Sequence, residues 1–151
     1  MKALIFAVVL LAFSVGALLA DTGKAPGKLG LGVVLGAPTG FAGKFWTGSR
    51  TAVDAALGFG DISLQATYLW HSWDVFPQPD EGRLPAYLGL GGRIKDTEDD
   101  TKAGLRTVAG VAYILPGDPV EVFIELAPVF NVAPKADVDI DGGIGLRYYF
   151  K

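Results

Sequence analysis

The chain has 151 residues, a length that suits one domain, and a formal net charge of −3. It contains no cysteine, which excludes disulfides, thiolate metal sites and a lipid-modified N-terminal cysteine. The charge is mildly acidic and no basic cluster is present, so we expect no nucleic-acid partner.

The beginning of the chain has the layout of a secretory signal peptide. Lys2 supplies the positive start, an almost wholly apolar stretch follows, and Ala20 offers a small residue at the cleavage point. The alternative is a membrane-anchoring helix, but the apolar run has only the minimum length for a span and no basic cluster follows it. We therefore expect a helical signal peptide over 1–20, a polar linker over 21–27 and one domain over 28–151.

The domain divides into apolar runs separated by Gly, Pro, Asp and Asn, the residues that punctuate strands. Most runs approach the roughly nine to eleven residues that a tilted membrane strand needs. The connections are short, which favours antiparallel pairing in sequence order. We expect eight strands, over 28–36, 41–47, 51–59, 62–74, 84–95, 102–115, 120–130 and 138–150.

Side chains alternate along most of these runs, with apolar residues on one face and charged or small residues on the other. In the fourth run Tyr68 and Trp70 share one face, while Thr67 and His71 take the other. A soluble sandwich or lipocalin also alternates, but its charges face outward. Here the apolar set is larger and more continuous, whereas the charges are mixed with Gly, Ala, Ser and Thr, as a narrow barrel interior requires.

Because lipid cannot satisfy an open strand edge, spanning strands must close into a barrel. The sequence thus predicts an all-β fold, a closed eight-stranded antiparallel up-and-down transmembrane β-barrel. Outward aromatic residues are expected at both membrane interfaces. One girdle comprises Phe45, Tyr68, Trp70, Tyr113, Tyr148 and Phe150, and the other Phe41, Phe59 and Phe130.

The opposite faces of the strands carry charged residues that we expect to pair inside the barrel, because an isolated buried charge is costly. Lys44 and Asp54 lie on adjacent strands, and Lys95 shares the inward face of its strand. A gated path for ions or small solutes is the alternative, but an eight-stranded barrel is normally filled by its own side chains. The expected interior network comprises Lys44, Asp54, His71, Arg93, Arg106, Glu121, Glu125, Asp141 and Arg147.

No residue pattern indicates catalysis or a cofactor. His71 is the only histidine, which excludes a metal centre built on several histidines. A Ser-His-acid hydrolase would need Ser49, Ser63 or Ser72 beside it, and none of these lies in a recognisable motif. The acidic run 96–101 lacks the ligand spacing of an EF-hand loop, so a solvated tip is favoured over a weak divalent-cation site. We expect no enzyme activity, no metal and no cofactor.

Four segments resemble small bacterial outer-membrane β-barrel proteins with an OmpA-like eight-stranded transmembrane domain. They are the Leu-Gly-Leu-Gly-Val-Val-Leu-Gly-Ala-Pro-Thr-Gly start over 29–40, Tyr68-Leu69-Trp70-His71, the Leu-Gly-Leu-Gly-Gly-Arg stretch over 88–93, and the Gly-Leu-Arg-Tyr-Tyr-Phe end over 145–150. The Gly-Ala-Pro-Thr-Gly part resembles a poorly characterised group of such barrels. The last strand closes on Phe150, which is similar to the signal for the barrel-assembly machinery, although Lys151 follows it.

The resemblance implies a bacterial outer-membrane location, contact with membrane lipid and lipopolysaccharide, and a monomer. It carries no established activity, so we expect a structural or surface-interaction role. The alternatives are a narrow, porin-like channel for ions or small solutes and, less favoured, a lipid-modifying enzyme. A soluble periplasmic binder of lipocalin type is a further alternative.

Overall fold

The computed structural model describes residues 28–117 and 119–150, and the predicted signal peptide and linker lie outside them. The described residues form an all-β structure, a closed barrel of eight strands, and contain no helix that is long and apolar enough to span a membrane. The strands are β1 (Leu29–Ala37), β2 (Gly40–Trp46), β3 (Thr51–Gly58), β4 (Ser63–Ser72), β5 (Ala86–Asp96), β6 (Thr101–Ile114), β7 (Val120–Ala133) and β8 (Asp137–Phe150).

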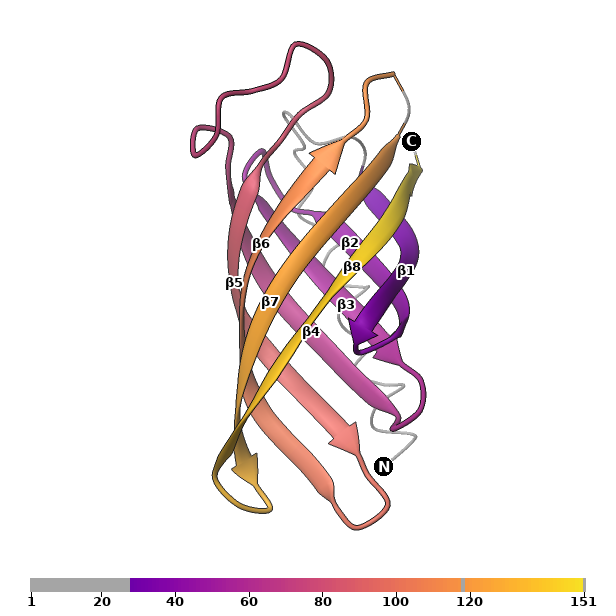
Figure 1. Ribbon diagram of the computed structural model, residues 1–151, viewed down its shortest axis with the longest axis vertical. Helices are drawn as coiled ribbons and strands as arrows, with labels where there is room; N and C mark the ends of the chain where they lie inside the picture. The colour runs from indigo at the N-terminus through magenta and orange to yellow at the C-terminus, as the bar shows by residue number, and fades with distance from the viewer. Residues whose placement is uncertain (1–27, 118, 151) are drawn as a thin grey trace.

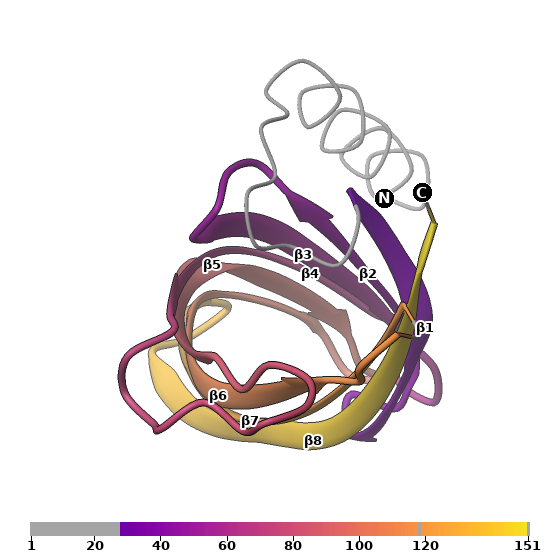
Figure 2. The ribbon, with the colours of Figure 1, turned by 90° about the horizontal axis from the view of Figure 1, so that it is seen from above.

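Each strand pairs antiparallel with the next, and β8 closes the barrel by pairing with β1. The closing ladder runs from Leu29 opposite Phe150 to Ala37 opposite Gly142. Viewed from above, the strands form a ring in which β1 lies beside β8 (Figure 2). The predicted fold class, a closed eight-stranded antiparallel barrel, is confirmed.

The barrel wall is uneven in height. Strands β1–β4 have 7 to 10 residues, whereas β5–β8 have 11 to 14. We call the end where β1 begins and β8 ends the terminal end, and the opposite end the far end. The β5–β6 and β7–β8 hairpins reach well beyond the β1–β2 turn at the far end (Figure 1). The far end therefore has a low rim on one side and a high wall on the other.

The predicted strand ends agree with the structure to within two residues except at the end of β7. This strand was expected to end at Phe130 and continues to Ala133. The extra residues include Asn131, which pairs across to Asp137 on β8 and donates a hydrogen bond to its carboxylate. A polar residue in this position indicated a loop, but its side chain points into a polar lumen.

Burial in the barrel is inverted relative to a soluble protein. Outward aliphatic side chains such as Leu88 and Ile124 are 64% and 61% exposed, while Lys44, Arg106 and Glu121 on the inward faces are at most 1% exposed. This inversion follows from strand alternation, since every second side chain of each strand must enter the lumen. The folded barrel therefore has an apolar outer face, and its lumen holds the charged side chains together with a buried apolar cluster.

Three large inward aromatic rings fit into the narrow lumen because each of them faces a glycine directly across the ladder. A β-carbon on any of these glycines would collide with the opposing ring. Alternating large and small side chains in this way is how a small barrel fills its interior. The pairs are Gly30 with Tyr149, Gly110 with Tyr87 and Gly145 with Phe123.

Candidate functional site

The inward charged residues form the candidate site, and the structure places all nine predicted members in the lumen. Eight are buried residues, and the side chain of the ninth, Glu125, is 6% exposed. They separate into a terminal-end network around Glu121 and Glu125, and a far-end network around Arg93. The buried members are Lys44, Asp54, His71, Arg93, Arg106, Glu121, Asp141 and Arg147.

Glu121 is the centre of the terminal-end network. Its carboxylate accepts hydrogen bonds from Arg147 Nη1 at 2.6 Å, from the Tyr149 hydroxyl at 3.0 Å and from Lys44 Nζ at 3.3 Å. Arg147 also reaches Asp54, with Nη2 3.5 Å from Oδ2. Strands β2, β3, β7 and β8 are thus tied together by charges that compensate one another.

Lys44 and Asp54 face each other across the β2–β3 ladder, yet no ion pair joins them. Lys44 instead crosses the lumen to Glu121, and its ammonium lies 4.6 Å from the centre of the Trp46 ring. In a closed eight-stranded barrel, inward side chains of non-adjacent strands are near neighbours. The partner of Lys44 therefore depends on closure of the barrel and not on strand adjacency.

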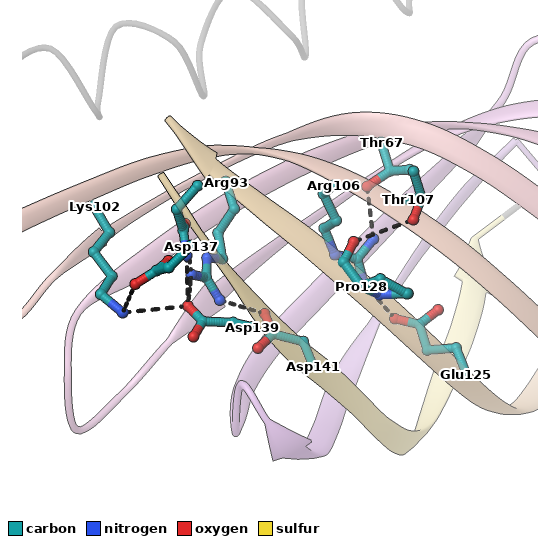
Figure 3. A network of polar contacts seen from close by, with 11 residues as sticks. Thr67, Arg93, Lys102, Arg106, Thr107, Glu125, Pro128, Asp137, Asp139 and Asp141 are labelled. Carbon is teal, nitrogen blue, oxygen red and sulfur yellow. Dashed lines mark hydrogen bonds and ion pairs between the residues drawn. The ribbon is translucent and has the colours of Figure 1, made fainter. Parts of the chain in front are cut away.

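Arg106 and Glu125 form the second part of the terminal-end network, seen in Figure 3. Arg106 Nη2 lies 2.9 Å from Glu125 Oε1, and Nη1 donates to the Thr67 hydroxyl at 2.7 Å. The Tyr87 hydroxyl donates to the other oxygen of Glu125 at 2.7 Å. This set joins β4, β5, β6 and β7, so the two halves of the network span the barrel.

His71 is held at the terminal end through both ring nitrogens. Nε2 lies 2.8 Å from Lys44 Nζ, and Nδ1 lies 3.1 Å from the Arg50 carbonyl oxygen. Because an ammonium only donates, Nε2 is the acceptor and Nδ1–H donates to Arg50. The ring also lies against Trp46, with centroids 4.2 Å apart. Both ring nitrogens of His71 therefore make structural contacts. The backbone carbonyl oxygen of Ser49 accepts a hydrogen bond from Trp73 Nε1.

Arg93 organises the far-end network, also shown in Figure 3. Its Nη1 donates to Asp141 at 2.8 Å, and its Nη2 donates to Asp139 at 2.7 Å and to the Asn131 amide oxygen at 3.1 Å. The guanidinium plane suits this arrangement because its donors have fixed directions. Two carboxylates of β8 are thereby fixed to β5.

The outer part of the far-end network is looser. Lys102 Nζ lies 3.5 Å from Asp139 and 3.6 Å from Asp137, and these side chains are 26–33% exposed. Asn131 Nδ2 donates to both carboxylates, at 2.6 Å to Asp137 and 2.8 Å to Asp139. Among the residues that the structure describes, no group of His, Asp and Glu side chains could hold a metal ion.

Eight of the nine predicted girdle residues lie on outward faces of the strands, and Phe59 lies in the turn that follows β3. Seven of the nine are exposed, while Phe45 and Tyr113 are half-buried. Neighbouring members form edge-to-face pairs, an arrangement that aromatic rings favour. The pairs are Phe41 with Phe59 toward the far end, and Tyr68 with Trp70 and Tyr148 with Phe150 toward the terminal end.

Several polar partners escaped the sequence prediction, although the signal for them was present. Asp139 and Tyr149 each lie two residues from a predicted interior charge, and so share its face. Tyr87 and Asn131 were missed because they carry no charge. Since every charged donor needs acceptors, inward neutral polar residues should be counted as network members from the start.

Comparisons of the chain with protein-family models, with curated proteins and with solved structures gave no match. The class of protein is therefore defined by the fold itself. It is a closed eight-stranded antiparallel barrel with a polar, ion-paired interior and an apolar exterior.

Proposed function

We propose that the protein spans the bacterial outer membrane as a barrel whose lumen is filled, and that it has a structural or surface-interaction role. The observation that carries this proposal is the inverted distribution of side chains. The lumen holds the ion pairs, and the outward faces of all eight strands carry large apolar residues.

The outward apolar surface is far larger than soluble monomers tolerate. Exposed aliphatic or aromatic side chains lie on the outer face of every strand, whereas soluble monomers rarely expose apolar patches beyond a few hundred Å². A hydrocarbon phase would cover this surface, and exposed aromatic pairs toward both ends suit two lipid–water interfaces. These features support a membrane location.

The filled lumen supports a role other than conduction. Trp46, Arg106, Arg147 and Tyr149 are large inward side chains that are almost fully buried. Salt bridges and hydrogen bonds hold both arginines in place, so moving them aside would break compensated charge pairs. A narrow channel is the alternative role, and the planar-bilayer experiment described below distinguishes the two.

Fractionation and gel migration test the location. When the full chain is expressed in a Gram-negative host, we expect it in the outer-membrane fraction and released only by detergent. The purified protein should migrate faster unheated than boiled, as a compact detergent-resistant barrel does. Extraction without detergent, or one migration position under both conditions, would overturn the proposal.

Planar bilayers test the role. We expect the folded protein to insert without discrete current steps under an applied voltage. Steady single-channel steps that change on Arg106→Ala would establish the channel alternative instead. The matched control is Lys135→Ala, because Lys135 is an exposed residue in the turn after β7.

A further inference from the structure

A polar hollow of about 250 Å³ lies at the far end, lined by residues of the β1–β2 and β3–β4 connections and of strands β4, β5 and β8. Its rim is formed by 36–39 before β2 and by Asp61 before β4, and its floor by Arg93 and Asp141. The floor is the Arg93–Asp141 ion pair, with 2.8 Å between Nη1 and Oδ2. Among the described residues that line the hollow, none belongs to the terminal-end network.

A serine hydroxyl that lines this hollow makes no hydrogen bond with the described residues. Ser63 is only 4% exposed, yet its side chain makes no hydrogen bond with any residue that the structure describes. Its Oγ lies against Gly58, the residue opposite it on β3, at a place where a β-carbon would collide. A hydroxyl that faces a hollow and has no protein partner can donate a hydrogen bond to a ligand there.

Two opposite charges lining the same hollow are also unpaired. Neither Lys95 nor Asp61 forms an ion pair with a described residue, although both line the hollow. Arg93 and Lys102, by contrast, each have two carboxylate partners. The far-end network therefore pairs Arg93 and Lys102 with carboxylates, whereas the Lys95 ammonium and the Asp61 carboxylate line the hollow without an ion-pair partner among the described residues.

We propose that this hollow binds a small zwitterion, a ligand with an ammonium group and a carboxylate or phosphate separated by a few bonds. The anionic group would pair with Lys95 and accept a hydrogen bond from Ser63, and the ammonium group would pair with Asp61. A ligand with a single charge would leave the opposite protein charge unpaired. The volume suits a free solute of this kind or the headgroup of a zwitterionic lipid, both of which share this chemistry.

Isothermal titration of the folded full chain in octyl glucoside tests the proposal, because this detergent carries no charge. The probes are O-phosphoethanolamine and glycine, with ethanolamine and inorganic phosphate as single-charge comparisons. We expect a Kd on the order of 1 mM for at least one zwitterion, and binding at least about fivefold weaker for both single-charge probes. Absence of zwitterion binding, or equal binding of inorganic phosphate, would overturn the proposal.

Matched variants locate the binding in the hollow. Lys95→Gln and Asp61→Asn should each weaken zwitterion binding about fivefold or more, the effect of losing one charge-assisted contact. The controls Lys135→Gln and Asp80→Asn remove exposed charges that do not line the hollow and should leave binding unchanged. Asp61 lies on an exposed turn, so its variant tests the site even if the Lys95 variant fails to fold. Unchanged binding by Asp61→Asn would contradict the proposal.

A lipid arm separates the two sources of ligand. Short-chain dihexanoylphosphatidylethanolamine that binds more tightly than O-phosphoethanolamine would assign the site to a headgroup, and the reverse order would assign it to a free solute. The titrations do not depend on where the protein resides. A soluble protein that binds zwitterions would refute the membrane proposal alone, and a membrane barrel that binds none would refute this inference alone.

Discussion

Both ends of the lumen hold networks of ion pairs, but the charged groups of the terminal-end network are more deeply buried than those of the far-end network. In the terminal-end network, Glu121 has three donors and is fully buried, and Lys44 and Arg147 are sealed beside it. In the far-end network, Arg93 is buried, but Lys102 and its partners remain partly exposed.

The difference shows how one barrel can combine rigidity with an open site. At the terminal end, every charge of the network has an ion-pair partner, either on a neighbouring strand or across the lumen. Where the β5–β8 hairpins stand above a low rim, inward side chains lack an opposite wall and some polar groups stay unpaired. Uneven strand length, rather than a special motif, separates the structural end from the accessible one.

The largest expected effect comes from removing the centre of the terminal-end network. Glu121→Ala leaves Lys44 and Arg147 buried beside a lost partner, so we expect the free energy of unfolding to fall by about 3–5 kcal/mol. Urea titration in detergent, followed by tryptophan fluorescence, measures the change. The control is Glu98→Ala in the exposed β5–β6 turn, which should have almost no effect. If Glu121→Ala were as stable as Glu98→Ala, the terminal-end network would not be the stabilising element that its burial indicates.

A smaller effect is expected from filling the space opposite an aromatic ring. Gly145→Ala places a β-carbon into the Phe123 ring, on which the Arg147 guanidinium stacks at 3.8 Å. Overpacking of this kind costs about 1–3 kcal/mol. The comparison is Gly92→Ala at the far-end side of β5, where the nearest atom would be 3.7 Å from the added carbon. If Gly92→Ala proved the more damaging by the same titration, the packing account would be wrong.

The smallest effect is expected at the outer part of the far-end network. Lys102→Ala removes two long, partly exposed ion pairs, and we expect a loss below about 1 kcal/mol. Raising the salt concentration should reduce this loss further, because exposed charges are screened. A loss as large as that of Glu121→Ala would mean that the far-end network is as structural as the terminal one.

Most of the fold was predictable because alternation repeats in most of the strands. Each inward charge, from Lys44 on β2 to Arg147 on β8, occupies the same parity as its strand neighbours. Turn residues then fixed the strand count and order. The end of β7 was missed because Asn131 is polar, and polarity marks both a loop and a lumen-facing strand residue.

The pairing inside the lumen was less predictable. Lys44 and Glu121 are 77 residues apart, and only closure of the barrel brings β2 to β7. Neither the stagger between strands nor the height of each hairpin follows from alternation. The hollow at the far end depends on both, which is why Ser63 and Lys95 could be assigned to a face but not to a common site.

Tryptophan quenching tests the central claim, that the outer face of the barrel lies in hydrocarbon, most directly. Trp70 is 50% exposed on the outer face of β4, whereas Trp46 and Trp73 are buried. In vesicles of lipids brominated on their acyl chains, we predict strong quenching of the wild-type emission and loss of most of this quenching in Trp70→Phe. Emission of Trp70 that brominated lipid leaves unchanged, but that aqueous iodide quenches, would contradict the account.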